Sequence, residues 1–184
     1  VVQPHLPTTQ MTTPFIDAAT ASLGLLFVRV ILGLLMAAHG SQKLLGWFGG
    51  HGLAGTAGFF DSMGFRPGRF FATLASATEV GSGLLLALGF LGPIGPALMI
   101  SVMIVAAVSM HLRNGLFAAN NGIEVPLLYG VVAAGLLLTG PGQYSLDAAL
   151  GLNILATPMI AWAALAIGVL GGIMNLFARR PVAA

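Results

Sequence analysis

The sequence predicts an all-α protein, an integral membrane helical bundle. Two observations support this prediction. Of the 184 residues, 57% are hydrophobic and only 7% are charged, whereas soluble domains carry roughly a quarter charged residues. Several apolar stretches are also long enough to cross a bilayer, which takes about 20 residues of helix. A nucleic-acid-binding function is excluded, because seven Lys and Arg spread over the whole chain form no basic footprint.

Five apolar stretches are the predicted membrane spans. They cover residues 22–45, 70–91, 93–112, 124–139 and 154–177. Prolines lie in or near the first turn of the last three, where a missing backbone N–H costs little. The fourth stretch is shorter than the others. We therefore expect a bundle of four spans followed by a fifth, C-terminal transmembrane helix.

The first stretch has a competing interpretation as a signal peptide. Its features oppose this, because it is too long, contains Arg29 and has no basic segment before it. Residues 1–20 are instead a predicted polar tail, in which Thr13 and Pro14 can begin a short interfacial helix. The expected organisation is this tail, a four-helix membrane domain over 21–150, a further helix over 151–178 and a basic terminus over 179–184.

The positions of Lys and Arg predict the orientation, because cytoplasmic loops are enriched in both. If the C-terminus is cytoplasmic, five spans place the N-terminus outside. The cytoplasmic side then holds Lys43, Arg66, Arg69, Arg113, Arg179 and Arg180. The outer side holds Asp17 and Asp147 and no basic residue.

Two loops carry local structure of their own. Residues 53–63 are predicted to form a short amphipathic helix on the membrane surface. Near the end of the fourth stretch, Ser145 is a candidate helix N-cap, with Asp147 in the positive first turn of that helix.

Arg29 lies inside the first predicted span, where a charge needs a partner or a purpose. On a helical wheel it shares a face with Gly33, Met36 and Gly40. We therefore expect Arg29 to point into the bundle as a structural charge. It would either extend to the outer headgroups or pair with a carboxylate.

Glu79 is the one carboxylate near the centre of a predicted span. Without a partner it would be largely protonated in the bilayer. One expectation is an ion pair or hydrogen bond with Arg29, His39 or Lys43. The other is that Glu79 carries protons or binds a ligand.

His39 and His111 lie near the cytoplasmic ends of two different spans, at similar depth. Four uses are open: a haem with two histidine ligands, a metal site with Glu79 or Glu124, a hydrogen-bonding pocket for a small polar headgroup such as that of a quinone, or an ordinary interfacial position. Haem and metal are the less favoured, and no intrinsic cofactor is expected.

Glu124 opens the fourth stretch, where its carboxylate suits the positive end of a helix. It also lies on the same side of the membrane as the histidines. The candidate site is therefore a polar cluster at the cytoplasmic rim, with Glu79 deeper beneath it. Its predicted members are His39, Lys43, His111, Arg113 and Glu124.

The same residues carry a resemblance to the DoxX family. The matching motifs are Arg29, then His39-Gly-Ser-Gln-Lys-Leu44 and Gly46-Trp-Phe-Gly-Gly50, Glu79 with Gly81 and Gly83-Leu-Leu-Leu-Ala-Leu-Gly89, His111 before Gly115-Leu-Phe117, Glu124-Val-Pro126, and Gly140-Pro-Gly-Gln-Tyr-Ser-Leu-Asp147. They cover about residues 22–148. The fifth stretch lies outside the family pattern.

The resemblance implies a four-span bundle in a bacterial or archaeal cytoplasmic (inner) membrane. It also implies a link to quinone-coupled redox metabolism, because relatives are named for a subunit of a thiosulfate:quinone oxidoreductase and others are associated with oxidative-stress defence. By resemblance, the residues expected to matter are Arg29, His39, Lys43, Glu79, His111 and Glu124.

The resulting hypothesis is a membrane subunit of a quinone-linked redox system. His39 or His111 would donate a hydrogen bond to the quinone, Glu79 would exchange protons, and membrane lipid and other membrane subunits would be the partners. The alternative is a non-catalytic accessory subunit of a larger complex. In that case Arg29 and Glu79 form a structural pair, and the helix with Gly168-x-x-x-Gly172 docks onto a partner.

Overall fold

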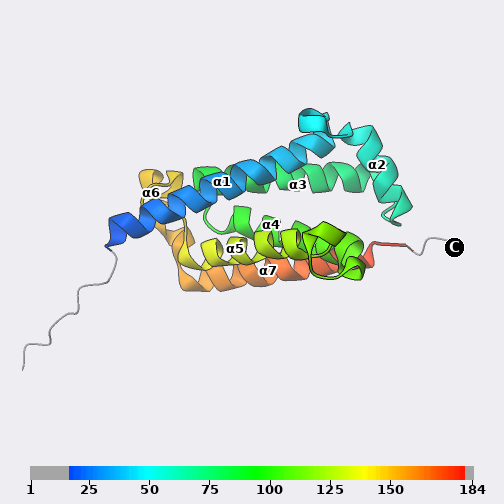
Figure 1. Ribbon diagram of the computed structural model, residues 1–184. Coiled ribbons are helices and arrows are strands. Elements are labelled where there is room, and N and C mark those ends of the chain that lie inside the picture. Colours follow the sequence, from blue (N-terminus) through cyan, green and yellow to red (C-terminus); the bar gives the residue numbers. More distant parts are fainter. Residues whose placement is uncertain (1–16, 181–184) are drawn as a thin grey trace, which may run out of the picture.

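The computed structural model describes residues 17–180, and in this part of the chain the regular structure is helical throughout (Figure 1). The helices are α1 (Ala18–Leu45), α2 (Gly52–Ser62), α3 (Gly68–Leu88), α4 (Ile94–Ala106), α5 (Glu124–Thr139), α6 (Leu146–Leu150) and α7 (Pro158–Phe177). The all-α fold class and the short helix predicted over 53–63 are confirmed. The possible helix start at Thr13 and Pro14 lies outside the described residues.

Four helices of the described chain are long and apolar enough to cross a membrane: α1, α3, α7 and α4 together with its continuation to Asn114. The fourth predicted stretch is the shorter apolar helix α5, whose bounds agree with the prediction. Its 16 residues are fewer than the ~20 that a hydrocarbon core requires. The chain is therefore a multi-pass membrane protein whose apolar outer surface contacts lipid.

Helix α1 begins earlier than predicted. Asp17 is its N-cap and accepts a 2.8 Å hydrogen bond from the backbone N–H of Thr20. This bond, with a second one from the Thr20 hydroxyl, lowers the pKa of the Asp17 carboxyl below its ordinary value. Residues 18–20, assigned by the sequence to the polar tail, therefore belong to the helix. The tail prediction was wrong at this boundary because it missed the cap.

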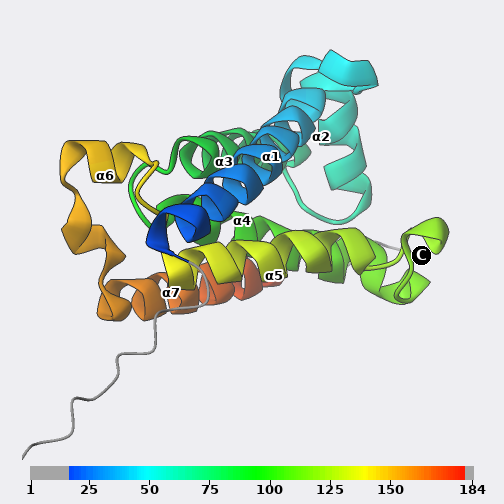
Figure 2. The ribbon, with the colours of Figure 1, turned by 60° about the vertical axis from the view of Figure 1, so that its left-hand side comes forward.

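The helices form two layers. One layer holds α1 packed along α3, with α2 across one end, and the other holds α4, α5 and α7 (Figures 1 and 2). Contact between α3 and α4 joins the layers, whereas α1 barely touches α5. The largest cluster of buried apolar side chains lies between the layers and includes Met36, Leu86 and Met99. The weak α1–α5 contact leaves room beside this core for cavities.

Small residues allow α1 and α3 to pack closely. A Cβ added at Gly33 would lie 2.7 Å from the backbone nitrogen of Ala87, and one at Gly83 would lie 2.6 Å from that of Ala37. Real Cβ atoms do not tolerate such distances, so these positions require glycine. The face of α1 predicted to point inward is confirmed, because Arg29, Gly33, Met36 and Gly40 are the buried residues of the helix.

Helix α7 uses its glycines within its own chain. A Cβ at Gly168 would lie 2.6 Å from the carbonyl oxygen of Ala97, and one at Gly172 would lie 2.9 Å from that of Ser101. Both contacts are with α4. The close approach expected of the Gly168-x-x-x-Gly172 spacing therefore serves intramolecular packing. The helix also starts at Pro158 rather than at 154, because a short 3₁₀ turn, Asn153–Ala156, precedes it.

Arg29 is buried at the end of the bundle that carries α6. Its guanidinium donates hydrogen bonds to the backbone carbonyls of Ala87, on α3, and Tyr144, before α6. These bonds join α1 to α3 and to the segment before α6, which agrees with the structural role that the sequence suggested for Arg29. The expected pairing of Arg29 with a carboxylate is wrong, because its guanidinium donates instead to backbone carbonyls of neighbouring segments.

Asp147 ties the same end together. Ser145 caps α6 as predicted, by accepting a 3.2 Å hydrogen bond from the N–H of Ala148. Asp147 lies in the first turn but is also buried, and its carboxylate accepts bonds from the N–H groups of Leu91 and Gly92 in the α3–α4 loop. Together with Arg29, it anchors three segments to one another.

The α4–α7 packing gives a first testable prediction. Gly168→Ala should lower the stability of the protein by about 1–3 kcal/mol, since the added methyl group overlaps the Ala97 carbonyl. The matched control is Gly135→Ala on α5, where a Cβ would meet no atom of the described chain within 4 Å. Thermal unfolding in detergent, followed by circular dichroism, measures the difference. Equal melting temperatures for the two variants would contradict the packing.

Candidate functional site

A cavity of about 130 Å³ lies between the two layers and brings several predicted site residues together. We call it the histidine cavity. Its lining residues come from α1, α3, α4 with its extension, and α5: Met36, His39, Lys43, Glu79, Met103, Ala106, Met110, His111, Val125, Pro126 and Tyr129. Of the six residues singled out by the resemblance, His39, Lys43, Glu79 and His111 therefore share one site, whereas Arg29 and Glu124 do not.

Lys43 and Glu79 form an ion pair in the wall of the histidine cavity. The Lys43 ammonium donates to Oε1 of Glu79. The Glu79 side chain is 2% exposed and that of Lys43 is 35% exposed, so the carboxylate is buried while the lysine extends toward the protein surface. The expectation that Glu79 pairs with a cation of α1 is confirmed. The alternative pairing with Arg29 is wrong, because Arg29 lies at the other end of α1.

The second carboxylate oxygen of Glu79 is free for a ligand. Oε2 is buried and has no hydrogen-bond partner within residues 17–180. Such a group costs free energy unless a ligand or water satisfies it. Nearby Ser76 and Ser82 do not, because their hydroxyls donate to the backbone carbonyls of Ala72 and Glu79. Oε2 of Glu79 is therefore a buried acceptor that a bound ligand or water can satisfy.

Aromatic and imidazole groups line the cavity beside the ion pair. The ring of His39 meets the ring of Tyr129 edge-on, with 6.1 Å between the centroids. Nδ1 of His111 donates to the carbonyl oxygen of Asn121, at 2.8 Å. This bond holds the ring of His111 against the loop before α5. His39 and Tyr129 thus supply hydrogen-bonding groups from α1 and α5, the two helices that barely touch.

A π-helical turn shapes the wall contributed by α4. The helix widens into a π-helix at Ala107–His111 before a final 3₁₀ turn. Wider turns of this kind are rare interruptions of α-helices and frequently lie at functional sites. Here the turn carries Met110 and His111 into the histidine cavity. The sequence predicted a helix to residue 112 and did not indicate the change of pitch.

Glu124 and Arg113 lie outside the cavity, so the predicted cluster was wrong for both. The Glu124 carboxylate accepts a 2.7 Å hydrogen bond from the backbone N–H of Ala118 in the preceding loop. It therefore closes that loop at the start of α5, in line with a structural role at a positive helix end. Arg113 follows the π-turn and is exposed.

The described residues do not offer a set of ligands for a metal ion. Within the described residues, no three His, Asp or Glu side chains are close enough to hold a metal ion. The two histidines do line the same cavity, but one nitrogen of His111 is already bonded to Asn121. The side chains present are donors and one free carboxylate oxygen, which suit a small ligand with polar oxygens.

Two further cavities follow the first in a row. The larger, about 200 Å³, lies under α2, and we call it the α2 cavity. It shares Lys43, Glu79, Ala106 and Met110 with the histidine cavity. Its other lining residues are His51, Gly55, Thr56, Phe59, Phe60, Met63, Phe65, Ala75, Val102, Val105 and Ser109.

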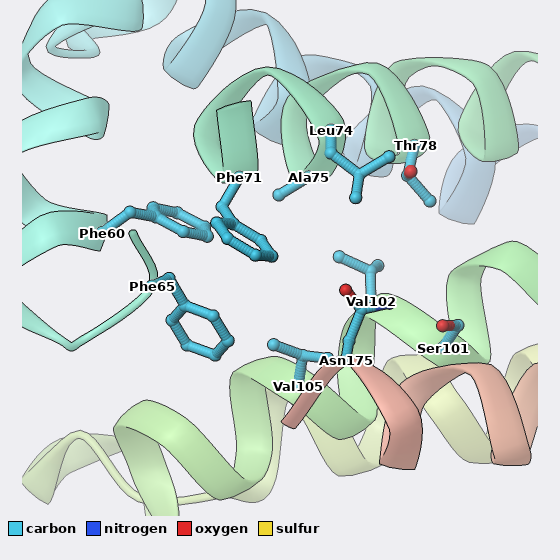
Figure 3. Close-up of a pocket in the computed structure, with 10 residues that line it drawn as sticks. All are labelled: Phe60, Phe65, Phe71, Leu74, Ala75, Thr78, Ser101, Val102, Val105 and Asn175. Atoms are coloured by element: carbon cyan, nitrogen blue, oxygen red, sulfur yellow. The ribbon is translucent and has the colours of Figure 1, made fainter. Parts of the chain in front are cut away.

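The third, of about 50 Å³, lies between α3, α4 and α7, and we call it the small cavity. Figure 3 shows its lining, with Leu74 and Thr78 on one side and Val102, Val105 and Asn175 on the other. It shares Phe60, Phe65, Ala75, Val102 and Val105 with the α2 cavity.

Tyr129 is the site residue that sequence reasoning missed. It follows Pro126 by three residues and precedes Ala133 by four, and both neighbours are buried. This helical spacing already placed Tyr129 toward the interior of α5, and it was a signal that could have been used.

The ion pair gives a second prediction. Lys43→Met should destabilise the protein by about 2 kcal/mol, because it leaves the buried Glu79 carboxylate without its cation. The cost stays below that of a wholly buried pair, since Lys43 is one-third exposed. Adding Glu79→Gln to the same chain should recover most of the loss. Unfolding midpoints of the single and double variants test this, and additive losses would contradict a paired role.

Comparison with known proteins agrees with the resemblance. The DoxX family model matches residues 24–112, which include α1 through the π-turn. The match is shorter than the expected 22–148 and leaves out α5 and α7. Searches of curated proteins and of solved structures found no significant match. Residues 24–112 of this multi-pass membrane protein thus belong to the DoxX family.

Proposed function

We propose that this protein is a membrane subunit of a quinone-linked redox system and that it binds the quinone headgroup in the histidine cavity. The observation that carries the proposal is Oε2 of Glu79, buried in the cavity wall and without a partner in the described chain. Small-ligand sites combine a mostly apolar lining with a few placed polar groups. The histidine cavity has this composition, at the depth of a lipid-soluble ligand.

The side chains match the chemistry of a quinone. A quinone carries two carbonyl oxygens, which accept hydrogen bonds, and His39 and Tyr129 are donors beside one wall. Reduction to the hydroquinone takes two electrons and two protons and converts both carbonyls to hydroxyls. A redox partner protein supplies the electrons. Glu79 relays the protons, because it is the buried carboxyl group of the cavity: with each electron it takes up one proton by way of Lys43 and passes it to one of the two quinone oxygens.

Lys43 completes this role. Its partial exposure connects the buried carboxylate to water at the end of α1, so Glu79 can be reprotonated after each transfer. In the reverse direction, the free carboxylate oxygen would accept a proton from a bound hydroquinone. The ion pair therefore stabilises the bundle and also holds the proton-exchanging group in place.

Headgroup binding is the third prediction. A benzoquinone without a tail should bind the full chain in lipid nanodiscs, and Tyr129→Phe should weaken binding about three- to tenfold by removing one hydrogen-bond donor. Tyr144→Phe is the matched control, because Tyr144 lies at the far end of the bundle beside Arg29. Titration calorimetry with subtraction of empty nanodiscs measures both dissociation constants.

Glu79→Gln separates binding from chemistry in the same system. It should lower quinone-linked electron transfer in membranes that contain the redox partner, while Glu124→Gln, a matched change outside the cavity, should leave the rate unaltered. A wild-type chain that binds no benzoquinone would overturn the proposal. So would full activity of Glu79→Gln.

We also propose that the N-terminus lies outside and the C-terminus in the cytoplasm of a bacterial or archaeal membrane. The distribution of Lys and Arg supports this orientation. The chain has no cysteine, so single cysteines report on one site each. Gln143→Cys, in an exposed position beside α6, should react with an impermeant maleimide on intact cells.

The matched variant for this fourth prediction is Ser62→Cys at the end of α2, also exposed. It should react only after the membrane is permeabilised. The opposite labelling pattern would reverse the orientation.

A further inference from the structure

The three cavities form a row across the bundle. The histidine cavity begins at His39, which is exposed on α1 opposite α5. The α2 cavity shares the wall formed by Lys43, Glu79, Ala106 and Met110. The small cavity continues from it and ends beside Leu74, which is 42% exposed on α3. The row therefore reaches the lipid-facing surface of the protein at both ends.

The polarity of the lining changes along this row. Imidazole, phenol, ammonium and carboxylate groups surround the first cavity. The α2 cavity keeps Lys43 and Glu79 on the shared wall and adds His51, Thr56 and Ser109, but the rest of its lining, which includes Phe59, Phe60, Met63 and Phe65, is apolar. Figure 3 shows the rings of Phe60, Phe65 and Phe71 grouped at the start of the small cavity. Water needs two to four polar partners to fill a cavity. The region where the α2 cavity meets the small cavity is lined by Phe60, Phe65, Ala75, Val102 and Val105, so an apolar group fits this region better than water does.

The wall between the first two cavities can yield. Its apolar part is Ala106, a small residue, and Met110, a flexible unbranched side chain that adapts to irregular gaps. Met110 also lies in the π-helical turn, where the helix is already widened. An extended apolar chain can therefore pass beside the ion pair without breaking it.

We propose that the ligand is a quinone with an isoprenoid tail, and that the first part of the tail lies in the α2 cavity and the small cavity. This inference rests on the proposed function, because it takes the headgroup site in the histidine cavity as given. It adds a substrate class, tailed quinones, and a second set of binding residues that recognise the tail alone. Ala75 and Val105 are the most informative of these, since each lines both apolar cavities.

The test compares two quinones with the same headgroup. One has no isoprenoid tail, and the other has a tail of two isoprene units. Ala75→Phe should fill the apolar cavities and weaken binding of the two-unit quinone at least about tenfold, the effect of losing a few buried methylene groups. Binding of the tailless quinone should change by less than about twofold. Val105→Phe fills the same space from α4 and should give the same selective loss, should Ala75→Phe fail to fold.

The matched control is Ala77→Phe, on the same helix but at an exposed, lipid-facing position. It should alter neither dissociation constant. Calorimetry on the full chain in nanodiscs gives all values, and comparison among variants cancels the partitioning of each quinone into lipid.

Each other outcome overturns the inference. Equal weakening of both quinones by Ala75→Phe would place the headgroup, rather than the tail, in the apolar cavities. No weakening of either would place the tail elsewhere. Native mass spectrometry adds one arm: a phospholipid retained by the wild-type chain and lost from Ala75→Phe, with unchanged tail dependence, would assign the cavities to a lipid acyl chain. If the tailless quinone does not bind the wild-type chain at all, the proposed function itself fails.

Discussion

The Lys43–Glu79 ion pair is the interaction on which the rest of this structure depends. A carboxylate within an apolar bundle requires a compensating charge, and α1 provides it. The pair can form only where α1 and α3 pack closely, which is why glycines lie at their crossing and a Cβ at Gly40 would overlap Val80. One electrostatic requirement therefore sets the spacing of two helices and the position of the cavities beside them.

The two ends of α1 differ in how the buried charged groups beside them are bonded. At one end, Arg29 is bonded to backbone carbonyls, and Asp147 is bonded to the α3–α4 loop. The terminal nitrogens of Arg29 and the carboxylate of Asp147 thus join neighbouring segments to one another. At the other end, Glu79 keeps one oxygen free and Lys43 stays partly exposed. Nε of Arg29 is also buried without a partner in the described chain, but Glu79 lies in the wall of a cavity of about 130 Å³, and this position favours its end of the bundle as the site.

The sequence predicts the apolar helices and the buried face of α1, whereas the contacts between helices cannot be predicted from it, for a physical reason. Hydropathy located the apolar helices, and helical periodicity identified the buried face of α1, because both depend on neighbours along one chain. The partner of Glu79 depends on how far α3 slides along α1. Arg29 and Lys43 are 14 residues apart, roughly 21 Å of helix, and periodicity is the same for either register. The π-turn likewise depends on packing between helices, whereas the inward position of Tyr129 could have been found from its spacing along α5.

Helix α7 bears on how this chain relates to a four-span bundle. It lies outside the matched family region, and an added helix invites the interpretation of a docking surface. Its two spaced glycines nevertheless pack directly against α4, and Asn175 lines the small cavity. The helix therefore does two things within its own chain: it covers α4 and it supplies part of the lining of the small cavity. In the proposed tail site, Asn175 is therefore part of the wall of the small cavity, while the row stays open to the protein surface beside Leu74.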